Sequence, residues 1–175
     1  MRIRHSHLLA AAALFASAGN SAVHIAIPWL VLEITGSSAN AGVVLGISGF
    51  SVIFTAPIIG GLIAVLGARP VSIWADIISA GSVILFPIVG TLFGLNLASL
   101  LIIAIVGALF DPAGATARKS LIQAVAEHDG LSLLKFNGTY EAAATIGTVI
   151  GPTGAALAIG FVGINATFYL IAIVF

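Results

Sequence analysis

The chain has 175 residues, of which 60% are hydrophobic and 7% are charged, whereas an ordinary soluble domain is about one quarter charged. This composition, with a mean hydropathy of +1.22, excludes a soluble globular domain and predicts an integral membrane protein. The charges of six acidic and six basic residues cancel, so the sequence predicts no nucleic-acid partner. Cysteine is absent, which excludes disulfides and thiolate metal sites.

The first apolar segment, 8–34, allows two interpretations. Its basic start, short apolar stretch and following small residues resemble a cleaved secretory signal. However, the apolar character continues without a break through VHIAIPWLVLEI. We therefore interpret 8–34 as the first membrane helix.

Further apolar segments follow at 41–66, 71–92, 97–117, 137–160 and 164–175, separated by short linkers rich in glycine, asparagine, serine or proline. The segment 164–175 is shorter than the roughly 20 residues that a crossing needs. The predicted fold class is an all-α integral membrane protein, a polytopic bundle of five full transmembrane helices plus the start of a sixth. Either the chain is incomplete, which we favour, or its last helix is not a full crossing.

The positive charges predict the orientation of the bundle. The linkers 35–40, 91–96 and 160–165 contain no lysine or arginine. All six cations lie in the N-terminus and the other linkers: Arg2, Arg4, Arg69, Arg118, Lys119 and Lys135. Because successive helices alternate in direction, these segments share one side, and the positive-inside rule makes that side cytoplasmic. We expect a plasma-membrane protein with a cytoplasmic N-terminus.

One linker, 118–136, has dense mixed charge. Leucine, isoleucine and valine residues flank the central EHDG. This pattern predicts two short amphipathic pieces joined by a turn on the cytoplasmic face. A charged surface loop is the interpretation that we prefer to a binding role.

Polar side chains interrupt the first helix near the middle of the membrane. They are Ser17, Asn20, Ser21 and His24. They could form hydrogen bonds to neighbouring helices, or they could line an aqueous cavity in which His24 changes charge near physiological pH. The residues alone leave both possibilities open.

Two acids within the apolar segments need partners. Asp76 lies near the cytoplasmic end of 71–92, within reach of Arg69, Arg118 or Lys119, so we predict a structural ion pair. Asp111 precedes Pro112 deep in 97–117, with no cation within one helical turn. The cost of removing its carboxylate from water is harder to explain for Asp111 than for Asp76. Asp111 is therefore our candidate for a proton-titrating residue. Glu33 and Glu141 are expected to be structural, Glu141 beside Lys135.

Small residues line one face of 137–160 at four-residue intervals: Ala143, Gly147, Gly151 and Ala155. Lipid provides no hydrophobic driving force between helices, so such a face favours close helix packing. Pro152 follows Gly151 and predicts a bend on this face.

Several of these motifs together resemble the N-terminal half of a major facilitator superfamily transporter. The stretch GGLIAVLGARP resembles the loop between helices 2 and 3, in which Gly60, Leu62, Gly67 and Arg69 keep the pattern, whereas Ala64, Val65 and Ala68 replace charged residues. The stretches WADIISA, FDPAGATARKSLIQAV and LLKFNG resemble the branch that includes macrolide-efflux and enterobactin-export proteins.

The stretch GTVIGPTGAA is similar to the antiporter motif of this superfamily. Gly147, Gly151 and Pro152 are retained, but alanines replace the usual closing glycine pair. The arginine often found inside helix 4 of drug/proton antiporters is also absent, since 100–110 contains no charge.

The resemblance implies two six-helix halves with substrate bound between them and alternating access, so a C-terminal half is an expected partner. It also implies that Gly60 and Gly67 form a cytoplasmic hinge, where Arg69 and Asp76 carry what remains of the family's charged contact.

The sequence therefore predicts a secondary active transporter that exports a small amphiphilic or apolar compound through the lipid bilayer. The alternative is a non-transporting membrane protein or truncated product that acts by helix association. No paired acids, nucleophile motif or histidine cluster with ligand spacing predicts an enzyme, a cofactor or a metal. Coupling to a proton gradient stays possible.

Overall fold

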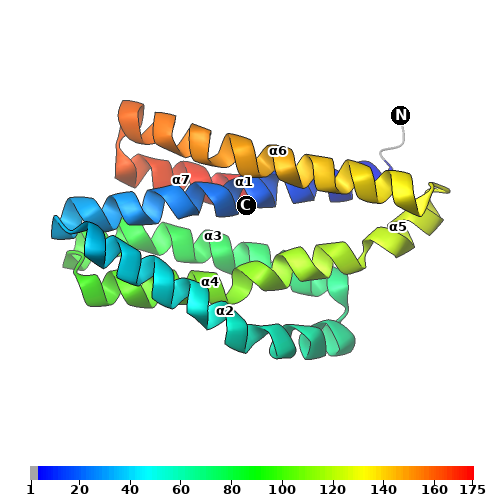
Figure 1. The fold of residues 1–175 in the computed structure, drawn as a ribbon, viewed down its shortest axis with the longest axis horizontal. Helices are drawn as coiled ribbons and strands as arrows, with labels where there is room; N and C mark the ends of the chain where they lie inside the picture. The colour runs from blue at the N-terminus through cyan, green and yellow to red at the C-terminus, as the bar shows by residue number, and fades with distance from the viewer. Residues whose placement is uncertain (1–3) are drawn as a thin grey trace.

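A computed structural model describes residues 4–175, except the side chains of residues 51, 52, 54 and 56. Arg2, one of the six cations, lies outside this range. The described chain is an all-helical bundle (Figure 1). Its helices are α1 (His5–Thr35), α2 (Ser38–Leu66), α3 (Ala68–Phe93), α4 (Leu97–Ser120), α5 (Ile122–His128), α6 (Leu133–Val162) and α7 (Ile164–Val174).

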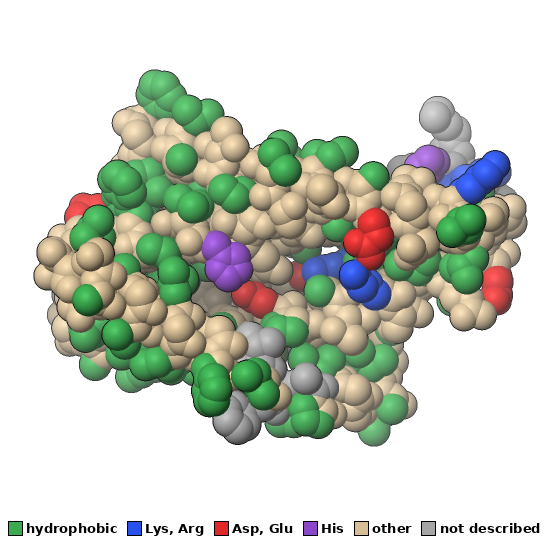
Figure 2. All heavy atoms as spheres, viewed as in Figure 1, with side chains coloured by type: hydrophobic (Ala, Val, Ile, Leu, Met, Phe, Trp, Pro, Cys, Tyr) green, Lys and Arg blue, Asp and Glu red, His purple; other side chains and the backbone are tan. Residues whose placement is uncertain are grey.

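The long helices are suited to a membrane. By length and composition, His5–Thr35, Ala68–Phe93, Leu97–His128 and Leu133–Val162 can each cross a bilayer. Helix α2 has 29 residues and contributes the apolar stretches Ser38–Phe50 and Pro57–Leu66. Large apolar side chains are exposed on the bundle, with Phe161 86% and Phe93 83% exposed (Figure 2). Such a surface fits lipid, so the predicted fold class is confirmed.

The turn between α2 and α3 is a single residue. Gly67 has φ +85°, and its N–H donates to the carbonyl of Ile63. A positive φ favours glycine, whereas Gly60 lies inside α2. Gly67 therefore forms the turn and Gly60 belongs to the helix, while the role of both residues as a cytoplasmic hinge stays a prediction.

The linker predicted at 118–136 is shorter than expected. Helix α4 continues to Ser120, and α6 already begins at Leu133. Only α5 is a separate amphipathic piece, with Ile122 and Ala126 buried. The second predicted piece is instead the first turns of α6, so the connection between the two long helices is α5 and a short turn.

The connections alternate between the two ends of the bundle (Figure 1). The start of α1, the α2–α3 turn and the α5 connection lie at one end, which we call the basic end. The described cations Arg4, Arg69, Arg118, Lys119 and Lys135 belong to these segments or to the adjoining helix ends. The α1–α2, α3–α4 and α6–α7 turns lie at the opposite end and carry no lysine or arginine.

Helices α1 and α6 form the most extensive helix pair of the bundle. A Cβ atom added to Gly147 would overlap the carbonyl oxygen of Leu14, and one added to Gly151 would overlap the carbonyl oxygen of Ala18. Both glycines are buried, whereas Gly154 on the same helix is exposed and has nothing within 4 Å of an added Cβ. The backbones of α1 and α6 are therefore as close as they are because these two positions lack side chains.

We expect Gly151→Ala to destabilise the bundle by about 2 kcal/mol, because the added methyl group meets backbone that cannot move without shifting α1. Gly154→Ala is the matched control, and alanine's better helix propensity should leave this variant neutral or up to about 1 kcal/mol more stable. Unfolding in detergent micelles, followed by circular dichroism, measures both. Equal stabilities of the two variants would contradict the close contact.

Candidate functional site

A cavity of about 370 Å³ opens between the first four helices. Most of its wall is apolar, and the C-terminal residue, Phe175, contributes to it. Five polar side chains interrupt this apolar wall: His24, Ser48, Ser79, Ser82 and Asp111. An apolar hollow with a few polar groups is the usual form of a small-molecule site.

Asp111 is held by helix α3. Its Oδ1 accepts a hydrogen bond of 2.7 Å from the hydroxyl of Ser79, and the hydroxyl of Ser82 donates to the carbonyl of Ser79 at 2.8 Å. The next residue, Pro112, has no N–H, so the carbonyl of Ala108 loses its helical donor. Ala108 also lines the cavity. The α3–α4 wall is therefore its most polar part.

His24 and Ser48 bring further polar groups to the cavity from α1 and α2. Among the described residues, His24 is the one histidine and Asp111 the one acid that line the cavity. His24 is exposed. The hydroxyl of Ser48 is buried and has no hydrogen-bond partner among the described residues. A buried hydroxyl without a partner is costly unless water or a ligand reaches it.

The structure separates the residues that the sequence grouped on the first helix. His24 lines the cavity, but Ser17, Asn20 and Ser21 do not. Ser17 faces α6, since a Cβ added to Gly147 would lie 3.0 Å from its Cβ. The Oδ1 atom of Asn20 is buried without a partner among the described residues. Their role in a substrate path stays a prediction.

The three cavity serines were not predicted. A signal for two of them was present, because Ser72, Asp76, Ser79 and Ser82 recur every three or four residues and so lie near one face of a helix. That face is turned toward α4, where it meets Asp111 and Arg118. Ser48 begins a similar series, because Ser51 and Thr55 follow it three and seven residues further on.

Asp76 forms a second polar cluster with Arg118 nearer the basic end. Nη1 of Arg118 lies 2.7 Å from Oδ1 and from Oδ2 of Asp76, and 3.4 Å from the hydroxyl of Ser72. Arg118 is only 3% exposed. Gly114 leaves room for this pair, since an added Cβ would lie 3.2 Å from Oδ1 of Asp76.

The partner predicted for Asp76 is therefore corrected from Arg69 to Arg118. Arg69 is exposed at the start of α3. The salt bridge of Glu141 is corrected as well: its carboxylate lies 2.9 Å from Nζ of Lys119 rather than beside Lys135. That pair joins α4 to α6 across the surface.

Comparison with known proteins identifies the family. The model of the Major Facilitator Superfamily matches residues 9–175. The chain belongs to the major facilitator superfamily. No solved structure matches significantly.

Among curated proteins, the chain is similar to the multidrug efflux pump Tap of Mycolicibacterium fortuitum, with 38% identity over 89% of this chain and 39% of the pump. It is 34% identical to the pumps of the same name from Mycobacterium tuberculosis H37Rv and Mycobacterium bovis BCG, over 96% of this chain and 41% of each pump. The chain thus spans about 40% of the length of these relatives. The narrower resemblance to macrolide and enterobactin exporters stays a prediction.

Within this superfamily chain, two motifs gain a structural explanation. The loop motif contains the one-residue turn at Gly67, and its arginine, Arg69, is not the partner of Asp76, which pairs with Arg118. The antiporter-like motif on α6 supplies Gly147 and Gly151, which seat α6 on α1. Pro152 lies inside the same helix and is partly buried.

We expect Asp76→Asn to destabilise this superfamily bundle by about 3 kcal/mol, because it leaves the guanidinium of Arg118 buried without its counter-charge. Glu141→Gln removes the carboxylate of a pair whose side chains are 57% and 46% exposed, so it should cost less than about 1 kcal/mol. Denaturant unfolding in micelles compares the two. Equal losses would show that the Asp76–Arg118 pair acts as a surface pair.

Proposed function

We propose that the chain forms one half of a secondary active transporter that exports a small amphiphilic or apolar compound by alternating access. The observation that carries this proposal is the cavity with Asp111 and His24 in an otherwise apolar wall. A substrate with a mostly apolar surface fits the apolar wall of the cavity, and the few polar side chains in that wall can orient it. Similarity to multidrug efflux pumps supports the direction and the substrate class.

A second half of comparable size completes the proposed transporter. Transporters of this superfamily hold substrate between two related halves near the middle of the membrane. The cavity is bounded by α1–α4 and Phe175 alone, and the relatives are about two and a half times as long as the matched stretch. Both facts favour a cavity wall contributed by a second half.

Asp111 is the group that we propose couples export to a proton gradient. Among the described residues it is the only acid that lines the cavity, and its partner, Ser79, is neutral. A carboxyl group without a fixed cation can gain and lose a proton without breaking a salt bridge, which is what a titrating transport residue needs. His24 shares the cavity and is the second residue that can change its charge there.

The basic end of the bundle is proposed to face the cytoplasm at the plasma membrane. The support is the positive-inside rule, applied to the described cations that gather at this end. Because the chain contains no cysteine, single cysteines give an unambiguous test of orientation.

We expect Ser38→Cys, at the α1–α2 end, to react with a membrane-impermeant maleimide in intact cells, and Ser132→Cys, next to α6, to react only after permeabilisation. Both serines are exposed, and the two changes are matched in size. The rest of the protein is made cysteine-free. The reverse labelling pattern would contradict a cytoplasmic basic end.

The transport proposal is tested with inside-out vesicles that contain the whole protein and take up a fluorescent amphiphilic dye when a pH gradient is applied. In this assay, Asp111→Asn should abolish uptake of the dye. His24→Ala should lower the rate and flatten its dependence on pH. Glu33→Gln is the matched control, because Glu33 is exposed near the opposite end of α1 and does not line the cavity.

Two outcomes would contradict these assignments. Unchanged uptake in Asp111→Asn would remove Asp111 from the coupling mechanism. The absence of gradient-driven transport in the unaltered protein, across amphiphilic and apolar dyes, would favour the alternative of a non-transporting membrane protein that acts by helix association.

A further inference from the structure

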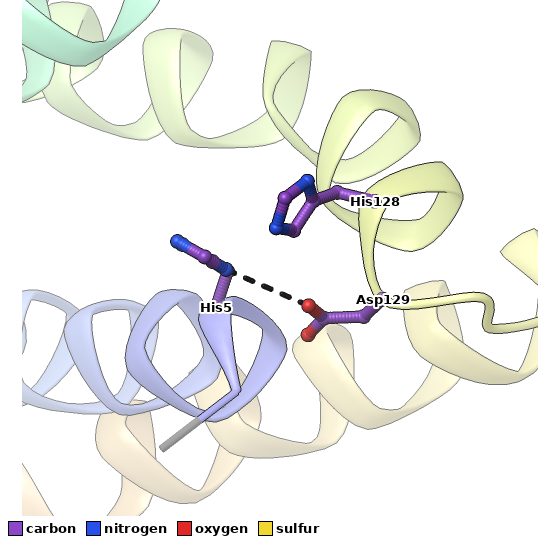
Figure 3. A group of neighbouring side chains, drawn as sticks. All are labelled: His5, His128 and Asp129. Carbon is purple, nitrogen blue, oxygen red and sulfur yellow. Dashed lines mark ion pairs between the residues drawn. The ribbon is translucent and has the colours of Figure 1, made fainter. Parts of the chain in front are cut away.

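Three side chains with metal-ligand chemistry meet at the basic end of the bundle. His5 is the first residue of α1, His128 is the last residue of α5, and Asp129 follows it. One ligand atom from each residue lies within 4.8 Å of the others. Figure 3 shows the two imidazole rings and the carboxylate grouped around a common space.

The spacing of this group, which we call the His5 cluster, suits an ion held between the side chains better than a direct hydrogen bond. Nδ1 of His5 lies 3.6 Å from Oδ1 of Asp129, which exceeds the ordinary hydrogen-bond range of about 2.7–3.2 Å. Two ligands of one tetrahedral Zn²⁺, each about 2.0–2.1 Å from the metal, stand about 3.3 Å apart. The rings of His5 and His128 are perpendicular, with their centroids 4.5 Å apart, and one ligand atom of each ring lies within 4.8 Å of the other and of the carboxylate.

The carboxylate of Asp129 is already held in place. Its Oδ2 accepts a hydrogen bond of 2.8 Å from the backbone N–H of Ser6, which leaves Oδ1 on the side of His5. This hydrogen bond is the main cause that lowers the pKa of Asp129 to about 2. The carboxylate is therefore negative at any physiological pH, and its outer partner fixes its orientation, as the supporting shell of a metal site does.

Two of the cations of this end, Arg4 and Lys135, lie beside the cluster rather than in it. An adjoining groove is lined by Arg4, His7 and Lys135. None of His5, His128 and Asp129 lines that groove, and none lines the central cavity. The cluster is therefore separate from the proposed substrate site.

We propose that His5, His128 and Asp129 bind a divalent transition-metal ion of the Zn²⁺ class. Two imidazoles and one carboxylate suit Zn²⁺, Ni²⁺ or Cu²⁺, whereas Mg²⁺ and Ca²⁺ prefer all-oxygen sites. Three protein ligands leave a fourth position for water. The bound ion joins the first turn of α1 to the end of α5, two segments that are more than 120 residues apart in the chain.

The test measures Zn²⁺ binding by calorimetry on the whole protein in nanodiscs, without a polyhistidine tag. His128→Ala and His5→Ala should each weaken Zn²⁺ affinity by more than about 100-fold, because each removes a direct ligand and loss of an outer-shell partner alone already costs about 10–100-fold. His7→Ala is the matched control, because His7 lies on the same turn of α1 but lines the groove. The Zn²⁺ affinity of this variant should equal that of the unaltered protein.

Two further measurements use the same samples. Zn²⁺ should raise the melting temperature of the unaltered protein and of His7→Ala, but not of His128→Ala, because a ligand that binds only the folded state stabilises it. Co²⁺ should give visible absorption typical of a tetrahedral site, and Mg²⁺ should give no heat.

The proposal is overturned if the unaltered protein does not bind Zn²⁺ at millimolar concentration, or if His128→Ala and His5→Ala bind as tightly as His7→Ala. In the first case the cluster is an ion pair between His5 and Asp129 alone. The experiment measures Zn²⁺ binding and not transport. A failure of the transport proposal therefore leaves the metal-binding result unaffected, and a failure of metal binding leaves the transport proposal unaffected.

Discussion

The close approach of α6 to α1 is the contact on which the rest of the bundle depends. Inside a bilayer, apolar side chains gain nothing by leaving lipid for a neighbouring helix, so helix pairs are held by packing and by backbone proximity. Gly147 and Gly151 provide that proximity, since any Cβ at either position would collide with the backbone of α1. This contact sets where α1 lies, and α1 then supplies His24 to the central cavity.

Polar groups inside the bundle follow a different constraint. Each one must find a partner or water, because lipid provides neither. Arg118 meets this requirement with Asp76 and Ser72, while Asp111 finds a neutral partner in Ser79. The two acids therefore have different roles available to them: the carboxylate of Asp76 is committed to a buried cation, and that of Asp111 is not. This difference is the physical reason why we propose a structural role for Asp76 and a proton-titrating role for Asp111.

The elements were predictable from the sequence because hydropathy is a local property, and each long apolar run became a helix. Contacts between helices were less predictable. The charge of Asp76 predicted a cationic partner, but three arginine or lysine residues were within reach in the sequence. Only the packing of α4 against α3 places Arg118, rather than Arg69, beside Asp76. The His5 cluster gave no signal in the sequence, because its members meet across more than 120 residues. Likewise, the sequence alone does not show that Ser48 belongs to a cavity, because its neighbours there come from α1, α3 and α4.

Helix α1 connects two polar regions of the described bundle, the central cavity and the His5 cluster. Its middle packs on α6 through the two glycines, its outer half carries His24, and its first turn is attached to the α5 connection by the hydrogen bond between Ser6 and Asp129. Two contacts therefore fix α1, one with α6 near its middle and one with the α5 connection at its first turn. Because both contacts hold the same helix, they also determine where His24 lies in the cavity. The proposed substrate site and the His5 cluster thus share this helix but no residue.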